Sequence, residues 1–246
     1  MFNPSKNLVI FGRKAVLEAL QNSQLVVSKI HLANSNKSAK ILDEICTLAK
    51  QRNVAIDYKD KLQLSRISKS SKQDQGVAAD IQLPTLHHID ELANLSSQKS
   101  SANKLLLLDG VTNPQNVGMI IRSVAASGIT GLILPRKGCA DLGPLVIKAS
   151  AGTIFNCPIY RCDKAEQALN LVKTNQGKIF SLALGAKTRL GEETSSETLN
   201  VYILGNESEG VSKQCLAMSD ETVTIPMHNN VESLNVAITA ALIAFG

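Results

Sequence analysis

The sequence is poor in aromatic residues and shows no spacing typical of a metal site. Its 246 residues include no Trp, and Phe, Trp and Tyr together make up 3% of the chain. Few side chains are therefore available to stack on the bases of a single-stranded nucleic acid. The five cysteines are an odd number, with no Cys-x-x-Cys spacing and no histidines at zinc-ligand intervals. We predict no bound metal, and buried thiols that act as small hydrophobic residues at Cys157 and Cys162.

Long apolar runs and several common catalytic motifs are also missing. No apolar run reaches the length of about 18 residues that crosses a bilayer, and residues 1–14 lack the apolar core of a secretion signal. A soluble cytoplasmic protein without a membrane contact is expected. The absence of G-x-G-x-x-G after the first strand of the second half, and of G-x-x-x-x-G-K-[ST] anywhere, counts against Rossmann and P-loop enzymes.

The histidines give no support to a Ser-His-Asp hydrolase, since no G-x-S-x-G motif accompanies them. His31, His87 and His88 lie in polar or linker contexts, and we predict that they are exposed. His228 is predicted to be a loop residue close to one of the motifs described below.

The net charge of +5 lies entirely in the first part of the chain. Residues 1–103 contain 14 Lys and Arg against 9 Asp and Glu, whereas residues 104–246 contain 12 of each class. Five basic residues lie within fourteen positions and are opposed only by Asp60: Lys59, Lys61, Arg66, Lys69 and Lys72. A clustered positive surface favours contact with RNA phosphates. The charge alone fits solvated Lys-rich and Ser-rich loops equally well.

Strand and helix patterns alternate along residues 1–83. An apolar start and a helix are expected at 8–20, strands at 27–33, 54–60 and 76–83, and a helix at 38–53. This alternation predicts a small α/β domain that ends before Pro84. Residues 84–103 combine a short helical stretch with a polar run that can bury little surface, so we predict a linker there.

Residues 104–246 show the same alternation with longer apolar runs. LLLLDG at 105–110 is typical of a strand buried on both faces of a parallel sheet. In the helix that follows, Asn113 can cap the N-terminus and Pro114 suits the first helical position. Gly128 suits the position just after the C-terminal end. Further strands are expected at 131–135, 157–162, 178–184, 201–205 and 222–227, with helices through 148–152, at 165–175 and from Leu234. The pattern predicts a doubly wound α/β domain.

Three segments place polar or glycine residues directly after an expected strand, at 109–123, 203–212 and 225–237. Sheets of this class bind ligands at the carboxyl ends of their strands. Each segment alone also fits a structural role, such as a tight turn between Gly205 and Gly210 or a helix cap at Ser233. Only their joint order indicates a function.

Together the three segments resemble the motifs of the SpoU family of SPOUT trefoil-knot RNA methyltransferases. Asn116 and Arg122 match the first motif, and Asn206, Glu207 and Gly210 match the second. The third motif is matched by Pro226, Ser233, Leu234 and Asn235. The resemblance extends to residues 148–152, and to residues 12–20 and 75–84 in the accessory domain of the family.

The resemblance implies a fold and a reaction that the residue pattern alone does not. The fold is a mainly parallel methyltransferase domain whose C-terminal segment threads a loop to form a knot, preceded by a ribosomal-protein-like α/β domain that binds the substrate. The reaction uses S-adenosylmethionine to methylate a ribose 2′-hydroxyl of RNA, with a guanosine of large-subunit ribosomal RNA favoured. The family also implies a homodimer, and the apolar residues 234–246 suit a buried subunit interface.

The same resemblance implies roles for individual residues. The catalytic set is Arg122, Asn116, Glu207, Ser233 and Asn235. The cofactor-binding set is Leu204, Gly205, Asn206, Gly210, Ile225, Met227, Ser233 and Leu234. Because a guanidinium with a pKa above about 12 is a poor base, we favour Arg122 as an anchor for the target phosphate rather than as the base.

Two alternatives stay open at this point. The substrate could be transfer RNA, although the separate N-terminal domain favours ribosomal RNA. The chain could also be a non-catalytic RNA-binding or ribosome assembly factor, against which the intact motif residues argue.

Overall fold

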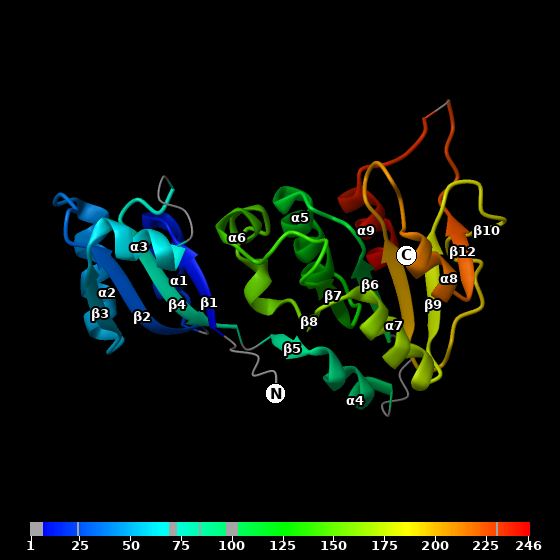
Figure 1. The fold of residues 1–246 in the computed structure, drawn as a ribbon, viewed down its shortest axis with the longest axis horizontal. Coiled ribbons are helices and arrows are strands. Elements are labelled where there is room, and N and C mark those ends of the chain that lie inside the picture. Colours follow the sequence, from blue (N-terminus) through cyan, green and yellow to red (C-terminus); the bar gives the residue numbers. More distant parts are fainter. Residues whose placement is uncertain (1–6, 24, 69–72, 84, 97–102, 230) are drawn as a thin grey trace. The chain divides into compact units, whose positions relative to one another are not determined.

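The computed structural model describes residues 7–23, 25–68, 73–83, 85–96, 103–229 and 231–246. Contacts between Cα atoms divide the chain into two compact units, residues 1–84 with 142–148 and residues 85–141 with 149–246. Figure 1 shows their helices and strands. None of the helices among the described residues is long and apolar enough to span a membrane.

The first unit is built on a four-stranded sheet with the order β1-β4-β2-β3. β2 pairs in parallel with β3 and antiparallel with β4, which also pairs antiparallel with β1. The alternating pattern expected from the sequence is present. The elements are β1 (Asn7–Phe11), α1 (Arg13–Gln21), β2 (Val26–Ala33), α2 (Lys40–Gln51), β3 (Ala55–Lys59), α3 (Lys61–Ser68) and β4 (Val77–Gln82).

Helix α3 is not among the helices expected from the sequence, where its basic residues are the more prominent feature. Leu64 and Ile67, three residues apart, pack with Ala33 and Ala78 of the sheet, and this spacing places both side chains on one helix face. Within the same stretch, the Lys59 ammonium lies 2.9 Å from the Asp57 carboxylate. Lys69 and Lys72 lie outside the described residues.

The second unit contains an eight-stranded sheet with the order β10-β12-β9-β11-β6-β7-β8-β5, in which every strand pair is parallel. The prediction of an α/β fold with a mainly parallel sheet is therefore confirmed; the knot stays a prediction. The strands are β5 (Leu86–His88), β6 (Lys104–Leu108), β7 (Gly131–Pro135), β8 (Ile159–Cys162), β9 (Lys178–Leu182), β10 (Thr188–Arg189), β11 (Asn200–Leu204) and β12 (Glu221–Thr224).

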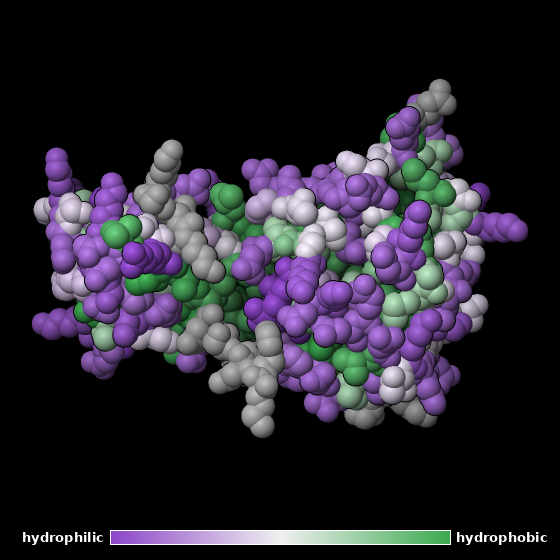
Figure 2. Space-filling view, in the orientation of Figure 1, coloured by the Kyte–Doolittle hydropathy of each residue, from purple (hydrophilic) through white to green (hydrophobic). Residues whose placement is uncertain are grey.

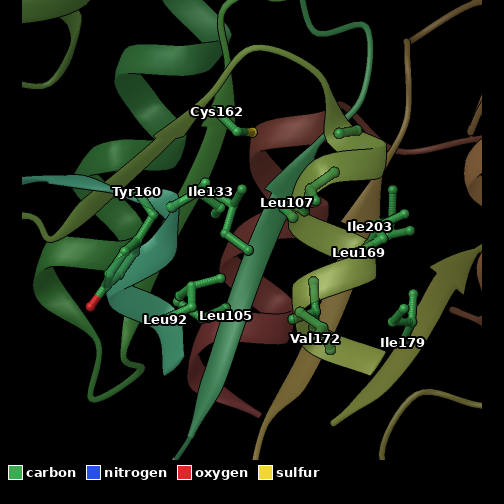
Figure 3. Packing of buried hydrophobic residues seen from close by; sticks show 14 of the residues in the cluster. Leu92, Leu105, Leu107, Ile133, Tyr160, Cys162, Leu169, Val172, Ile179 and Ile203 are labelled. Atoms are coloured by element: carbon green, nitrogen blue, oxygen red, sulfur yellow. The ribbon is translucent and has the colours of Figure 1, made fainter. Parts of the chain in front are cut away.

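Helices cover both faces of this sheet. α5 and α9 contact each other, as do α7 and α8. Leu105 and Leu107 of β6 belong to the cluster that packs against Leu169 of α7 (Figure 3). The alternate residues Leu106 and Leu108, equally buried, point to the opposite face because side chains alternate along a strand. The helices of this unit are α4 (Leu92–Ser96), α5 (Pro114–Ala126), α7 (Ala165–Thr174), α8 (Lys213–Met218) and α9 (Val236–Phe245), with 3₁₀ turns η1 (Ile89–Glu91) and η2 (Thr153–Asn156), whereas most of α6 (Pro144–Ala149) belongs to the first unit.

Side-chain caps set the starts of the two helices next to the motif segments. Asn113 Oδ1 accepts a hydrogen bond from Gln115 N at 2.9 Å, and Pro114 occupies the first position of α5, as predicted. The last helix begins at Val236 rather than at Leu234. The reason is that Asn235 is its cap, with Oδ1 accepting from Ala237 N at 2.9 Å.

Part of the segment predicted as a linker adds an edge strand to the second sheet. β5 pairs in parallel with β8, and Ile89 and Leu92 are buried in the same cluster as Leu107. The sequence predicts the short helical stretch but not the strand, because β5 contains a single apolar residue, Leu86. Residues 84 and 97–102 lie outside the described residues, and the linker role of 84–103 stays a prediction.

The cysteines agree with expectation, whereas the histidines depart from it: the side chains of His87 and His88, predicted to be exposed, are only 30% and 29% exposed. Cys157 and Cys162 are buried and free, and burial raises the pKa of both thiols to about 12. The prediction that His31 is exposed is wrong. It is 6% exposed, and its Nε2 lies 3.0 Å from Oδ2 of Asp80, a partner on the neighbouring strand that the local sequence does not reveal.

Candidate cofactor cavity and catalytic network

A cavity of about 490 Å³ lies where strands β9, β11 and β12 end, since Leu182, Leu204 and Thr224 all line it. Its volume is within the range of about 300–1,000 Å³ typical of small-molecule sites. All eight residues of the expected cofactor-binding set line the cavity: Leu204, Gly205, Asn206, Gly210, Ile225, Met227, Ser233 and Leu234. Strand ends far apart in the sequence thus meet at one edge of the sheet.

Residues of the loop after β9 were missed. Ala183 and Leu184 line the cavity with Leu182, although no motif marks them. β9 lies between β11 and β12 in the sheet, so its carboxyl end must fall between the second and third segments. The strand was expected from the sequence, but its place in the sheet order was not.

The second segment forms a tight loop that leaves no room for a side chain at Gly205. Asn206 N donates to Gly210 O, and Gly210 N donates to Asn206 O, both at 2.9 Å. A Cβ on Gly205 would lie 2.1 Å from the carbonyl carbon of Gly210 and 2.2 Å from Val211 N. Gly210 itself has a φ of +71°, which favours glycine. The shape of the cavity wall therefore depends on glycine at these positions.

Asn206 uses its side chain to join two segments. Its Nδ2 donates to Gly110 O at 2.8 Å, and its Oδ1 accepts from Ser208 N at 2.8 Å and from Glu209 N at 3.2 Å. Because both ends of the amide are engaged by the backbone, Asn206 supports the wall of the cavity. A nearby carboxylate acts in the same way: Asp109 Oδ2 accepts from Ser212 N at 2.7 Å.

A chain of side-chain hydrogen bonds links all three segments. Asn116 Nδ2 donates to Glu207 Oε1, and Asn235 Nδ2 donates to Asn116 Oδ1 at 3.2 Å. Asn116 is 6% exposed, whereas Glu207 and Asn235 are exposed, so the bonds are buried only at the Asn116 end. The network brings together three of the five residues in the expected catalytic set.

We expect Asn116→Ala to destabilise the fold by about 1–3 kcal/mol, because it removes the hydrogen bonds that Asn116 forms with Glu207 and Asn235, one of them to a carboxylate. Urea unfolding would measure this loss. In a double-mutant cycle, Asn116→Ala and Asn235→Ala should be non-additive by more than about 0.5 kcal/mol. Gln115→Ala, on an exposed position of the same helix, should change stability by less than about 0.5 kcal/mol. Additive effects at Asn116 and Asn235 would contradict the network.

The other two expected catalytic residues lie apart from this network. Ser233 lines the cavity. Arg122 is exposed on α5 and does not line it, and no described residue is hydrogen-bonded to its guanidinium. Its side chain is thus available to a ligand that approaches α5 from solvent.

The charge of the cavity limits what it can bind. Glu207, Glu209 and Glu232 line it, while its described lining contains no Lys, Arg or His. Carboxylates stabilise a cation and repel a phosphate group at close range. A ligand of nucleoside size with a positive charge fits this lining, whereas a nucleoside polyphosphate does not.

Comparisons with known proteins agree with this geometry. The model of the SpoU rRNA Methylase family matches residues 103–245, more than half of the chain. The chain belongs to this family. A second model, described as RNA 2′-O ribose methyltransferase substrate binding, matches residues 9–86. The prediction that the chain is a SpoU family RNA methyltransferase is therefore confirmed.

Individual relatives extend over most of the chain. A tRNA/rRNA methyltransferase of Synechocystis, named as uncharacterized, is 27% identical over 95% of the chain, which spans only 60% of that relative. A Staphylococcus saprophyticus protein, assigned by its name to the TrmH family of tRNA/rRNA methyltransferases, is 29% identical over 98% of the chain and 94% of its own length. The AdoMet-bound rRNA methyltransferase of Sinorhizobium meliloti shares the fold, with a TM-score of 0.67, 20% identity and coverage of 98% of this chain and 86% of that one.

Proposed function

We propose that this SpoU family member binds S-adenosylmethionine in the 490 Å³ cavity and transfers its methyl group to a ribose 2′-hydroxyl of RNA in the cytoplasm. The observation that carries the proposal is the lining of the cavity. The second and third motif segments, which follow β11 and β12, both line the cavity. Among the described lining residues there are three carboxylates and no cation. The sulfonium and amino groups of S-adenosylmethionine make it a net cation at neutral pH, which suits such a lining.

In this proposal the bound cofactor supplies an electrophilic methyl group, and the protein supplies position. The loop from Gly205 to Gly210 and the segment from Ile225 to Leu234 hold the adenosyl part. Arg122 holds a phosphate next to the target ribose through charge-assisted hydrogen bonds. Asn116 and Glu207 fix the loops around the ribose, and the 2′-hydroxyl proton passes to the target phosphate or to solvent.

Ribosomal RNA is the substrate we favour, with a guanosine of the large-subunit RNA as the target nucleoside. The net charge of +5 in residues 1–103 and the match of residues 9–86 to a substrate-binding model support a separate RNA-binding unit. The Sinorhizobium meliloti neighbour that aligns with 98% of this chain is named as an rRNA methyltransferase. We keep transfer RNA as the second candidate because the names of the sequence relatives include it.

The cofactor and the RNA are tested separately. Calorimetric titration with S-adenosylmethionine should give stoichiometric binding, whereas ATP should not bind because of the carboxylates. Tritiated methyl groups should then pass to ribosomal RNA isolated from a strain that lacks the protein, and not to RNA from the parent strain, whose sites are already filled. Transfer to transfer RNA alone would exclude the favoured substrate, and cofactor binding without transfer to any RNA would favour an assembly factor.

We also propose a homodimer formed through α9. Three large side chains along this helix are exposed: Ile238 at 53%, Leu242 at 44% and Phe245 at 64%. Their spacing of three to four residues places them in one apolar stripe. Such a stripe on a soluble protein is typical of a protein contact surface.

Leu242→Asp is expected to convert the dimer to a monomer, because the charge would be buried without a partner in the interface. Light scattering after gel filtration should show twice the mass of one chain for the wild type and the mass of one chain for the variant. Leu62→Asp, which changes an exposed leucine of the first unit (62%, against 44% for Leu242), is the matched control and should remain dimeric. A wild type with the mass of one chain at all concentrations would contradict the proposal.

A further inference from the structure

The first unit contains a cavity of its own, with a volume of about 720 Å³. It lies where Arg13 meets Gln75 and Gly76, in two segments that have no part in the methyl transfer described above. Its lining is polar apart from three residues, and consists of Arg13, Ala33, Ser35, Asn36, Lys37, Ser38, Ala39, Lys61, Leu64, Asp74, Gln75 and Gly76. Figure 2 shows mostly hydrophilic side chains over the visible face of this unit.

Hydrogen bonds fix the wall of the cavity. Arg13 Nε donates to Gln75 O at 3.1 Å, and Arg13 N donates to Gln75 Oε1 at 3.2 Å. Asn36 Nδ2 donates to Gly76 O at 2.8 Å. Gly76 has a φ of +77°, which favours glycine, and a Cβ there would lie 2.0 Å from Asn36 Oδ1 and displace that side chain. The loop, α1 and the end of β2 thus form one preorganised corner.

The cavity carries an excess of positive charge. Arg13, Lys37 and Lys61 line it against a single carboxylate, that of Asp74. None of the three cations forms an ion pair with a described acidic residue. Both oxygens of Asp74 are engaged within the loop, Oδ1 by Gly76 N and Oδ2 by Ser68 Oγ, each at 3.0 Å. Asp74 therefore shapes the loop, and the lining keeps a net charge of +2.

The other groups at the cavity are mainly hydrogen-bond donors. The hydroxyls of Ser35 and Ser38 line it. Helices α1 and α2 both begin at its edge, with Gly12 and Ala39 as their caps, and neither cap supplies a side-chain hydrogen bond to the first turn. Helix N-termini carry a partial positive charge, which adds to that of the three side chains. The combination of cations, hydroxyls and helix ends suits an anion with several oxygen atoms.

We propose that this cavity binds a backbone phosphate of the RNA substrate. The inference rests on the proposed function, because it takes RNA as the substrate, and it assigns the contact to Arg13, Lys37 and Lys61. A phosphodiester presents two charged oxygens that three cations and two hydroxyls can hold without reading the base. The cavity then sets where the RNA lies on the first unit and leaves the choice of nucleotide to other contacts.

The test compares two double variants of the full chain with the same loss of charge. Lys37→Gln with Lys61→Gln removes two cations of the cavity, neither of which forms a hydrogen bond or ion pair with a described residue. Lys29→Gln with Lys50→Gln is the control, since both side chains are exposed. Neither lysine lines the cavity, which β2 reaches at Ala33 and α2 at its N-terminal cap, Ala39. Binding of a fluorescein-labelled single-stranded RNA oligonucleotide is measured over a range of salt concentrations.

The cavity variant should bind this RNA about tenfold more weakly than the control. Its slope of log affinity against log salt should be shallower by at least about 0.7, the value for one phosphate contact of a single strand. Arg13→Gln should give a similar change, with thermal unfolding used to check its fold. Cofactor affinity should be equal in all variants.

Several outcomes separate this inference from the proposed function. Equal RNA affinity and equal salt slope in the two double variants would overturn the cavity proposal even if methyl transfer to RNA were observed. Tight calorimetric binding of inorganic phosphate to the cavity, with RNA binding unaffected by the variants, would identify a free phosphate as the ligand and also overturn it. RNA binding that depends on the cavity in a chain without methyltransferase activity would support the inference while contradicting the proposed function.

Discussion

Gly205→Ala is expected to abolish binding of S-adenosylmethionine. The added Cβ would lie 2.1 Å from the carbonyl carbon of Gly210 and 2.3 Å from its oxygen, and these are backbone atoms that cannot rotate away. The loop from 205 to 210 must therefore open, which displaces the wall that Gly205, Asn206 and Gly210 form. We expect an affinity loss of at least about 100-fold, equivalent to about 2.7 kcal/mol, measured by calorimetry.

The matched control is Gly128→Ala. No described residue lies within 4 Å of a Cβ at Gly128, and the φ of Gly128 is not in the left-handed region, so the substitution should leave cofactor affinity unchanged. Overpacking at Gly205 should also cost stability, by about 1–3 kcal/mol. Cofactor affinity is therefore measured under conditions where thermal unfolding shows the variant to be folded. Wild-type affinity in folded Gly205→Ala would contradict the placement of the cofactor in this cavity.

Arg122→Ala and Arg122→Lys are both expected to lower kcat for methyl transfer by at least about 100-fold, because the target ribose loses its fixed position. Lysine cannot replace the planar fork of the guanidinium in a bidentate contact with phosphate. Cofactor affinity should change little, since Arg122 does not line the cavity. Single-turnover transfer to ribosomal RNA and calorimetry with the cofactor would measure the two effects separately.

Arg189→Ala serves as the control for charge, because Arg189 is also exposed and lies outside the cavity lining. It should transfer methyl groups at the wild-type rate. If Arg122 acted as the base, the rate of the lysine variant would rise with pH as the ammonium lost its proton. A rate in Arg122→Ala close to that of the wild type would remove this residue from the catalytic set.

Local sequence was sufficient to predict the elements that carry the site. The run from Leu105 to Leu108 is a buried strand because both of its faces are covered. α5 begins where Asn113 caps the backbone and Pro114 takes the first helical position. The order of the three motif segments, interpreted through the family resemblance, also identified residues that prove to line a single cavity.

What the sequence could not predict depends on contacts between strands. The carboxyl end of β9 joins the cavity only because β9 lies between β11 and β12, an order that no local pattern encodes. His31 is buried and pairs with Asp80, which lies on β4 and is distant in the sequence. The hydrogen bonds from Asn116 to Glu207 and Asn235 likewise follow from the meeting of loops that are distant in the chain.

The most direct test of the proposed function is the position of the methyl group on the RNA product. RNA methylated by the purified protein with labelled S-adenosylmethionine would be hydrolysed in alkali and separated. A methyl group on the ribose 2′-oxygen removes the nucleophile that cleaves the adjacent phosphodiester. The label is therefore expected in alkali-resistant dinucleotides, and in 2′-O-methylguanosine after enzymatic digestion. Label in alkali-labile mononucleotides that carry a methylated base would contradict the proposed function.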